Sequence, residues 1–142
     1  MTTIAYKDGV IAYDSRVTAG NTIITDKEDK RHERDGVSFF VAGDDDGIQA
    51  VMDAYFGKRE DLKPGSAAFV CEGSKVIKAA ICGEEGYWTA KLDPEEFYAL
   101  GSGSDHAVTA MDMGATAEEA VRMAMKRDCC TGGEVRTFEV PK

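Results

Sequence analysis

The chain has 142 residues, of which 43% are hydrophobic and 30% are charged, and its formal net charge is −9. Because this length and composition are typical of globular proteins, we expect residues 1–142 to form one domain. The acidic charge argues against nucleic acid as a partner, since contact with phosphates requires clustered lysine and arginine side chains. No apolar run approaches the roughly 18 residues of a membrane span, and the N-terminus has no secretory signal pattern. The sequence therefore predicts a soluble cytoplasmic protein with neither a nucleic-acid nor a membrane partner.

The four cysteines do not have the spacing of a metal site. Cys71 and Cys82 stand apart, Cys129 and Cys130 are adjacent, and the chain has only two histidines that could assist them. Structural zinc sites usually combine CxxC-like pairs with further cysteines or histidines. We therefore expect reduced thiols, with no metal and no cofactor.

A β-hairpin is predicted at the start of the chain, because the first strand runs into the turn signal Asp8-Gly9. A two-residue turn would set Thr2 opposite Ser15, whereas a three-residue turn with a bulge would set it opposite Asp14. Paired strands lie about 5 Å apart. In either register, the head of the chain is predicted to lie within a few ångströms of the Asp14 carboxylate.

Residues 16–42 continue the β pattern. Arg16–Gly20 predicts a turn, residues 21–25 form a β-rich run, and the polar residues 26–34 predict a short strand with solvated side chains. Asp35-Gly36 is a second hairpin signal. The continuous apolar run 37–42 then predicts a buried strand that ends at a glycine.

An amphipathic helix of about ten residues is predicted next, ending at Gly57. Its apolar stripe consists of Ile48, Val51, Met52, Tyr55 and Phe56. The aspartates at 44–46 precede this stripe, where negative charge complements a helix N-terminus. They lack the twelve-residue spacing and terminal glutamate of an EF-hand, so we interpret them as capping residues and not as a calcium site.

The second half of the chain predicts more strands, then two helices and a last strand. A polar linker covers 58–65, and strands are expected at 67–72, 75–82, 87–92 and 97–100. One helix is expected at about 105–113, and a second is expected to run from the capping box at Thr116 to residue 128. The last strand is expected at 134–140. This order fits neither parallel βαβ units nor an all-β sandwich. It indicates an α+β fold with two stacked antiparallel sheets and helices on both outer faces.

Thr2 is a candidate nucleophile because it directly follows the initiator methionine. Methionine is usually removed before a small side chain, which would leave Thr2 with a hydroxyl and a free α-amine. Such an amine has a pKa of about 7.7–8.0, so it is partly neutral at cellular pH and can accept the hydroxyl proton. The sequence therefore suggests an N-terminal nucleophile that depends on Met1 removal.

Six segments carry a further pattern along the chain: Thr2-Thr3-Ile4, Asp14–Thr22, Lys30, Phe40–Gly43, Gly101–Ser104 and Arg127–Gly133. In content and order they resemble the proteasome β-subunit family, including the bacterial peptidase HslV, which are N-terminal-nucleophile (Ntn) hydrolases. The resemblance implies a four-layer αββα sandwich. The linker 58–65 stands where the family has a second long helix, so one helical layer would be reduced. The first hairpin is also about four residues shorter than is usual in the family.

The resemblance also implies a role for each candidate catalytic residue. Thr2 would attack through its hydroxyl, and Lys30, sixteen residues after Asp14, would lie beside it as a cation. Asp14 would orient Lys30 and keep it charged, and the backbone N–H of Gly43 would face the developing oxyanion.

Three further residues, Ser102, Asp128 and Thr131, would hold the free amine by hydrogen bonds, with Thr131 in place of the family's serine. The residues that match the family's specificity pocket are Val17, Glu28, His32, Val41 and Asp45. The two acids among them suggest tolerance for basic substrate side chains.

The function expected from this resemblance is a threonine endopeptidase that hydrolyses unfolded polypeptides. It would assemble into a homo-oligomeric ring and could receive substrate from a ring ATPase unfoldase. Two alternatives remain open at this point. One is a catalytically silent proteasome-like subunit with a structural role, and the other is an Ntn amidohydrolase that acts on a small molecule.

Overall fold

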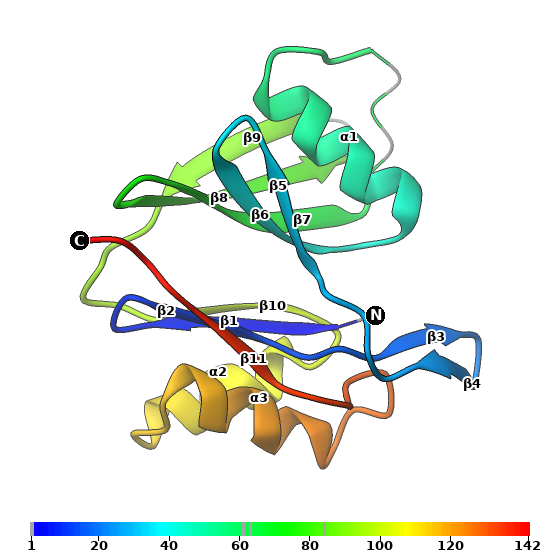
Figure 1. The fold of residues 1–142 in the computed structure, drawn as a ribbon, viewed down its shortest axis with the longest axis vertical. Coiled ribbons are helices and arrows are strands. Elements are labelled where there is room, and N and C mark those ends of the chain that lie inside the picture. The colour runs from blue at the N-terminus through cyan, green and yellow to red at the C-terminus, as the bar shows by residue number, and fades with distance from the viewer. Residues whose placement is uncertain (1, 61, 63, 84) are drawn as a thin grey trace.

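A computed structural model describes residues 2–60, 62, 64–83 and 85–142. Figure 1 shows two antiparallel sheets stacked above one another, with one helix on the outer side of the upper sheet and two on the outer side of the lower sheet. The described residues contain three helices, and the chain order is strands, one helix, strands, two helices and a strand, as predicted. The structure is thus a mixed α and β fold built on antiparallel sheets.

The lower sheet in Figure 1 carries the start of the chain. Its strand order is β10 (Tyr98–Gly101), β1 (Thr3–Lys7), β2 (Val10–Tyr13) and β11 (Arg136–Glu139). The β1–β2 turn has two residues, Asp8 and Gly9, with φ of 52° and 75°, which is the conformation that Asp-Gly favours in a tight hairpin. This turn gives the first of the two predicted registers, in which Ile4 faces Tyr13.

The upper sheet has five strands. They are, in order, β5 (Arg31–Arg34), β6 (Val37–Ala42), β7 (Ser66–Glu72), β8 (Lys75–Cys82) and β9 (Gly86–Lys91). The hairpin predicted at Asp35-Gly36 is confirmed, with φ of 52° and 78°. All six residues of β6 are buried, which confirms the prediction from its continuous apolar run.

A third, two-stranded sheet was not predicted. β3 (Val17–Ala19) pairs with β4 (Thr22–Thr25), and Figure 1 shows this ribbon projecting from the side of the molecule. The expectation of a turn over Arg16–Gly20 is therefore wrong. The β-branched side chains of Val17 and Thr18 favour extended backbone, and the turn is confined to the vicinity of Gly20, whose φ is 58°.

Two of the three helices in the described residues begin where a capping signal predicts. α1 (Asp45–Tyr55) is capped by the side chain of Asp44, which accepts from Gly47 N at 2.8 Å. α3 (Ala117–Met125) has the predicted capping box, although it ends three residues before the predicted limit. α2 (Ser104–Asp112) begins after Gly103 without a side-chain cap.

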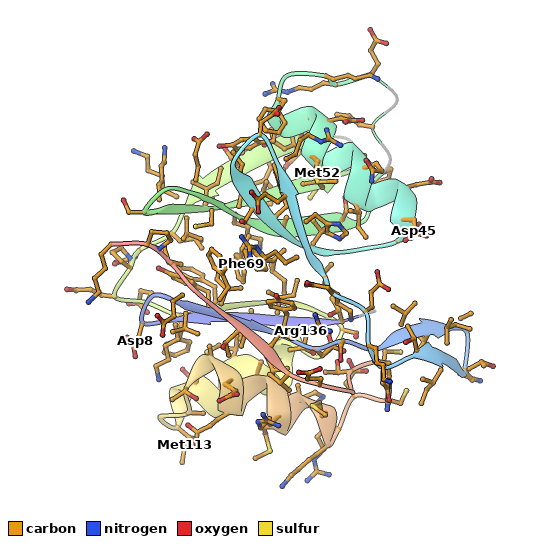
Figure 2. The ribbon with its side chains drawn as sticks, viewed as in Figure 1. Asp8, Asp45, Met52, Phe69, Met113 and Arg136 are labelled. Atoms are coloured by element: carbon orange, nitrogen blue, oxygen red, sulfur yellow. The ribbon has the colours of Figure 1, made fainter. Side chains whose placement is uncertain are left out.

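Alternation along the strands divides the core into separate layers. On β6, Phe40 faces the lower sheet and packs with Ile4 and Phe69, whereas Phe39 faces the other way and packs with Val51 of α1. Figure 2 shows Phe69 between the two sheets and Met52 between α1 and the upper sheet.

Small side chains let the other two helices lie close to the lower sheet. Ala5 and Ala12 lie on its outer face and pack against Ala120 and Val121 of α3 and Met111 of α2. Because Ile4 and Ala5 are neighbours on β1, the same strand serves two hydrophobic layers.

Some predictions lie outside the described residues. They concern Met1 and the parts of the predicted 58–65 linker at Asp61 and Lys63, as well as Glu84 in the turn before β9. None of the helices in the described part of the chain has the length and apolar character needed to cross a membrane.

Candidate active site

Thr2 directly precedes β1, Asp14 directly follows β2 and Lys30 directly precedes β5, and the three residues are in direct contact. Lys30 Nζ donates to Thr2 Oγ1 at 2.7 Å and to Asp14 Oδ1 at 2.8 Å, and Thr2 Oγ1 also donates to Asp14. The three residues are buried, with exposed fractions of 3% for Thr2, 0% for Asp14 and 8% for Lys30. The predicted proximity of the head of the chain to Asp14 is therefore confirmed.

Backbone amides from three segments hold the Asp14 carboxylate. It accepts from the N–H groups of Thr3 at 3.2 Å, Gly132 at 3.0 Å and Arg16 at 3.4 Å, in addition to the ammonium of Lys30. A buried carboxylate is tolerated only when it is paired and hydrogen-bonded. These contacts meet that requirement and fix the carboxylate beside Lys30.

Burial lowers the pKa of the Lys30 ammonium below its ordinary value, and the charge of Asp14 offsets part of this effect. A partly desolvated cation in contact with a hydroxyl favours the alkoxide form of that hydroxyl. The geometry thus lowers the cost of developing negative charge on Thr2 Oγ1.

A second polar network lies on the other side of Thr2. Asp128 Oδ2 accepts from Ser102 Oγ and from Thr131 Oγ1, both at 2.6 Å, and Thr131 Oγ1 lies 2.7 Å from Thr3 Oγ1. Ser102 Oγ also donates to the carbonyl oxygen of Thr2 at 3.4 Å. The network thus joins Ser102, Asp128 and Thr131, the three residues predicted to hold the amine, and connects them to the backbone of Thr2.

The charge of Asp128 is stabilised by these contacts. Burial by itself raises the pKa of this carboxyl, but the hydrogen bonds from Ser102, Thr131 and the Cys130 amide outweigh burial and hold the pKa below its ordinary value. Asp128 is therefore an anion at neutral pH and can hold an ammonium group at the end of the chain.

Two glycines allow close approaches of the backbone, one to Thr2 and one to Arg16. Gly101 has a φ of 97°, and a Cβ added there would lie 1.9 Å from the carbonyl oxygen of Thr2. A Cβ on Gly132 would lie 2.4 Å from Cζ of Arg16. These positions require glycine because a side chain would displace Thr2 or the loop that donates to Asp14.

The sequence analysis assigned no role to Arg16 or Asp26. Arg16 donates to both carboxylate oxygens of Asp26, at 2.9 and 3.2 Å, and to the carbonyl oxygen of Cys129 at 3.1 Å. The guanidinium of Arg16 thus connects the segment after β2 to the loop that carries Asp128. The only sequence signal was the Asp14-Ser15-Arg16 segment of the family pattern, because the distant partners have no local signature.

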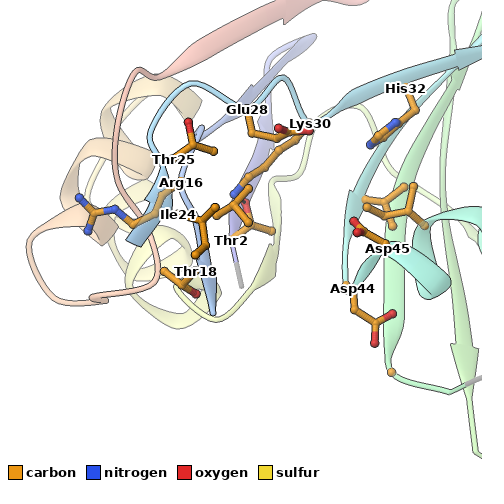
Figure 3. A pocket seen from close by; sticks show the side chains of 15 residues that line it. Thr2, Arg16, Thr18, Ile24, Thr25, Glu28, Lys30, His32, Asp44 and Asp45 are labelled. Carbon is orange, nitrogen blue, oxygen red and sulfur yellow. Dashed lines mark hydrogen bonds between the residues drawn. The ribbon is translucent and has the colours of Figure 1, made fainter. Parts of the chain in front are cut away.

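Thr2 and Lys30 open into a pocket of about 590 Å³ (Figure 3). The predicted residues that line it are Thr2, Val17, Glu28, Lys30, His32, Val41, Gly43 and Asp45. Asp14, Ser102, Asp128 and Thr131 are not among the lining residues and instead support Thr2 and Lys30 through the contacts above.

The lining also contains residues that the sequence analysis did not assign to the site: Arg16, Thr18, Ile24, Thr25, Asp44, Ile48 and Gly65. Four of them belong to the β3–β4 ribbon and its flank, whose strand pairing was not foreseen. Gly43 lies where β6 ends, and a Cβ there would lie 3.0 Å from Ser66 Cβ, which explains the glycine at this point.

One group of possible metal ligands lies next to the site. Donor atoms of Asp128, Cys129 and Cys130 lie within 4.8 Å of one another. Two sulfurs and a carboxylate oxygen are a donor set that zinc accepts, although Asp128 already accepts hydrogen bonds on both oxygens. The prediction that the protein uses no metal stays a prediction.

Comparisons with known proteins identify relatives by structure and not by sequence. Neither the protein-family models nor the curated proteins that were searched match the chain. A structure titled Thiobacillus denitrificans BPH in complex with epoxomicin superposes with a TM-score of 0.69 at 17% identity, covering 99% of both chains. A second structure of this BPH gives 0.64 at 18% identity, with coverage of 98% and 97%.

A eukaryotic HslV from Trypanosoma brucei gives a TM-score of 0.68 at 18% identity and covers 97% of this chain and 98% of its own. The similarity therefore extends over nearly the whole length of each chain. At such low identity the similarity is evidence about the fold alone. The chain has the fold of these proteasome-like proteins.

Proposed function

We propose that this protein is an N-terminal threonine peptidase of the proteasome and HslV type, which hydrolyses unfolded polypeptides after Met1 removal. The observation that carries the proposal is the buried contact of Lys30 Nζ with both Thr2 Oγ1 and Asp14 at the wall of a pocket of about 590 Å³. A lysine so buried and so paired is costly for a purely structural position. It fits a nucleophile that must be activated at neutral pH.

In the proposed mechanism, the free amine of Thr2 accepts the proton of its own hydroxyl, directly or through a water molecule. Oγ1 then attacks the carbonyl carbon of the scissile peptide bond, and the charge of Lys30 stabilises the attacking oxygen. The carbonyl oxygen becomes an oxyanion that faces the backbone N–H of Gly43. Removal of one such donor commonly costs on the order of 3–4 kcal/mol of activation free energy.

The tetrahedral intermediate then collapses. The protonated amine of Thr2 gives its proton to the leaving nitrogen, the C–N bond breaks, and the acyl group remains on Oγ1 as an ester. Water attacks the ester with the same amine as base, which releases the carboxylic acid and restores the hydroxyl. Ser102, Asp128 and Thr131 orient the amine during both proton transfers.

The finer features of the fold and assembly belong to the same proposal. We assign the chain as a single domain with the four-layer αββα arrangement, in which α1 forms the reduced layer. The two sheets between helices and the full-length likeness to HslV support this assignment. By the same analogy we expect a homo-oligomeric ring, a ring ATPase as a possible partner, and a cytoplasmic location.

Intact-mass spectrometry tests the function directly. Protein lacking Met1 is incubated with a threonine-directed epoxyketone or with epoxomicin, the compound named in the BPH complex. We expect one covalent adduct that maps to Thr2, no adduct on Thr2→Ala, and a strongly reduced rate for Lys30→Ala. A chain that keeps Met1 after native expression and never reacts would instead favour the silent subunit.

A further inference from the structure

The proposed mechanism gives no role to two thiols that lie beside the site. Cys129 and Cys130 are adjacent in the loop after α3, and both are free cysteines. The family pattern that residues 127–133 resemble does not specify these two positions. Donor atoms of Cys129, Cys130 and Asp128 lie within 4.8 Å of one another. The thiols therefore stand next to a carboxylate that the mechanism does use.

Two sulfurs and a carboxylate oxygen together favour a soft divalent cation. Thiolate ligands select zinc and similar ions, whereas Mg²⁺ and Ca²⁺ prefer oxygen ligands. With Zn–S bonds of about 2.3 Å and tetrahedral geometry, two coordinating sulfurs lie about 3.8 Å apart. The limit of 4.8 Å exceeds this separation by about 1 Å. Rotation of the cysteine side chains between their ordinary rotamers can close such a gap.

The cluster is open to an incoming ion. Cys129 is exposed, and Cys130 and Asp128 are half-buried. A metal ion can thus reach the sulfurs, and a water molecule can complete its coordination. Two thiolates, one carboxylate and a divalent cation leave one net negative charge. The guanidinium of Arg16, which donates to the carbonyl oxygen of Cys129 at 3.1 Å, lies close enough to offset this charge.

Hydrogen bonds on both sides of the cysteines hold the loop in place. The Gly132 amide donates to Asp14 at 3.0 Å, and the Thr131 amide donates to the carbonyl oxygen of Asp128 at 3.1 Å. The Cys130 amide donates to the Asp128 side chain, also at 3.1 Å. A site on a fixed backbone loses less conformational entropy when its ligand binds. The loop therefore presents the three donor groups side by side before a metal arrives.

The hydrogen bonds of Asp128 leave room for one more partner. A carboxylate has about four lone-pair positions. Among the hydrogen bonds of the described residues, Oδ2 accepts from Ser102 and Thr131, and Oδ1 accepts from the Cys130 amide alone. Such hydrogen bonds also orient a carboxylate that binds a metal. A metal ion at the remaining position of Oδ1 would take up the negative charge that otherwise holds the amine of Thr2.

We propose that Cys129, Cys130 and Asp128 form a binding site for a soft divalent cation such as Zn²⁺, and that its occupation inhibits the nucleophile. The inhibition rests on the proposed peptidase function, whereas the binding of the metal does not. Both thiols release their protons to solvent as the sulfurs and Oδ1 coordinate the ion, and water takes the fourth position. The charge of Asp128 is then neutralised, and the free amine of Thr2 is no longer held for proton transfer.

Metal binding is measured on reduced protein that a chelator has stripped of metal. Zn²⁺ is titrated in competition with a chromophoric chelator, and Co²⁺ is titrated while the thiolate-to-cobalt charge-transfer absorption is recorded. We expect one ion per chain and a charge-transfer band. Loss of a group that supports a metal ligand costs about 10–100-fold in affinity. Loss of a ligand in Cys129→Ser or Cys130→Ser should therefore cost at least about 100-fold, and Asp128→Asn at least about tenfold.

Cys82→Ser is the matched control. Cys82 is also an exposed free thiol, but it lies on β8 and outside the cluster. This variant should bind zinc with native affinity and give the native cobalt spectrum. Absence of a charge-transfer band, or unchanged zinc affinity in Cys129→Ser and Cys130→Ser, would overturn the metal site. Unchanged affinity in Asp128→Asn would remove the link to Thr2 and would overturn the proposal as well.

The rate of epoxyketone adduct formation on Thr2 tests the inhibition. With saturating Zn²⁺ we expect the rate to fall on the order of 10²-fold, as for misplacement of a reacting group, and to recover when EDTA is added. In a variant with both Cys129→Ser and Cys130→Ser, the rates with and without zinc should be equal. Inhibition that persists in this variant, or full zinc occupancy without inhibition of the native protein, would overturn the proposal. If metal-free protein never forms the adduct, the peptidase function and the inhibition both fail, while the cobalt spectrum still decides the metal site.

Discussion

The two walls of the pocket, one with Thr2 and the other with the start of α1, differ in whether their charged side chains are buried and paired. On the Thr2 wall, Lys30 and Asp14 are buried and in direct contact, and Arg16 is tied to Asp26. On the α1 wall, Asp45 is exposed and has no ion-pair partner among the described residues. Charges that are paired in the interior cannot be changed singly without a large free-energy cost, whereas exposed ones can.

This difference separates two requirements of the proposed function. Activation of a hydroxyl needs fixed distances, which the Thr2 wall obtains from the contacts of Lys30 at 2.7 and 2.8 Å and of the Gly132 amide at 3.0 Å. Selection of a substrate needs charge that remains available to a ligand, which the α1 wall retains. Substitutions on the first wall should therefore affect folding and activity together, whereas on the second wall an effect on folding is expected only for Asp44, which caps α1.

The largest effect is expected from Lys30→Met, which keeps the length of the side chain and removes its charge. It leaves the Asp14 carboxylate buried without a cation, and breaking a buried pair in this way costs about 3–5 kcal/mol. We expect this loss in the free energy of unfolding, measured with urea, together with loss of the Thr2 adduct.

Lys27→Met is the matched control, because Lys27 is exposed and close in sequence. It should change the free energy of unfolding by less than about 0.5 kcal/mol. If Lys30→Met were as stable as this control, Asp14 and Lys30 would not form the buried pair on which the comparison of the two walls depends.

The next effect concerns the close approach of the backbone behind Thr2. Gly101→Ala introduces a methyl group that would lie 1.9 Å from the Thr2 carbonyl oxygen, in a residue with φ of 97°. Gly114 has a similar φ of 102° but nothing within 4 Å of the added atom. Both alanines carry the strain of positive φ, about 1–2 kcal/mol, so the difference between them isolates the steric term.

We expect Gly101→Ala to be less stable than Gly114→Ala by at least about 2 kcal/mol, from thermal or urea unfolding. It should also lose reaction with the epoxyketone, because relief of the overlap displaces Thr2 from Lys30. Equal stability of the two variants would mean that the Thr2 backbone is free to move and that the Thr2 wall is not rigid.

The sequence predicted part of this site by local rules. The Asp8-Gly9 turn fixed the hairpin, and the hairpin brought the head of the chain to Asp14 without any appeal to homology. The stretch from Asp44 to Gly57 predicted α1 and its cap in the same way. These features depend on turn and capping chemistry within a few residues, which sequence patterns describe well.

The rest of the site depends on contacts between distant segments. The position of Lys30 came only from family resemblance, because the β3–β4 ribbon between Asp14 and Lys30 was not predicted and its return path sets where the lysine lies. The amide of Gly132 that donates to Asp14 has no local signature. Backbone donors carry no side-chain identity, so single-sequence patterns do not reveal them.

A smaller effect is expected from Asp128→Asn, which retains the shape of the side chain. Loss of its charge weakens the orientation of the amine, and misplacement of a reacting group can cost on the order of 10²-fold in rate. We expect a reduction of this order in the rate of adduct formation, with the native fold retained. Asp105→Asn, which removes an exposed acid elsewhere, should react at the native rate.

The pH dependence of stability checks the same residue. Because the folded protein holds the pKa of Asp128 below its ordinary value, the carboxylate contributes stability above the unfolded pKa of about 3.9, and this is lost as pH falls through the folded pKa. The difference in unfolding free energy between native protein and Asp128→Asn should therefore be largest near neutral pH and shrink below about pH 4. A constant difference across this range would show that the charge of Asp128 is not stabilised in the folded state.

The smallest effect distinguishes two neighbouring acids on the α1 wall. Asp44 caps the helix through Gly47 N at 2.8 Å, and loss of such a cap costs about 1 kcal/mol. Asp45 lies within the first turn and makes no capping bond. We expect Asp44→Ala to lower the free energy of unfolding by about 1 kcal/mol with little change in the relative turnover of arginine and leucine peptides, and Asp45→Ala to do the reverse. The two residues are adjacent and both line the pocket. Opposite effects of the two substitutions would therefore assign the helix cap to Asp44 and substrate selection to Asp45. Parallel changes in both variants would mean that the wall acts only through its total charge.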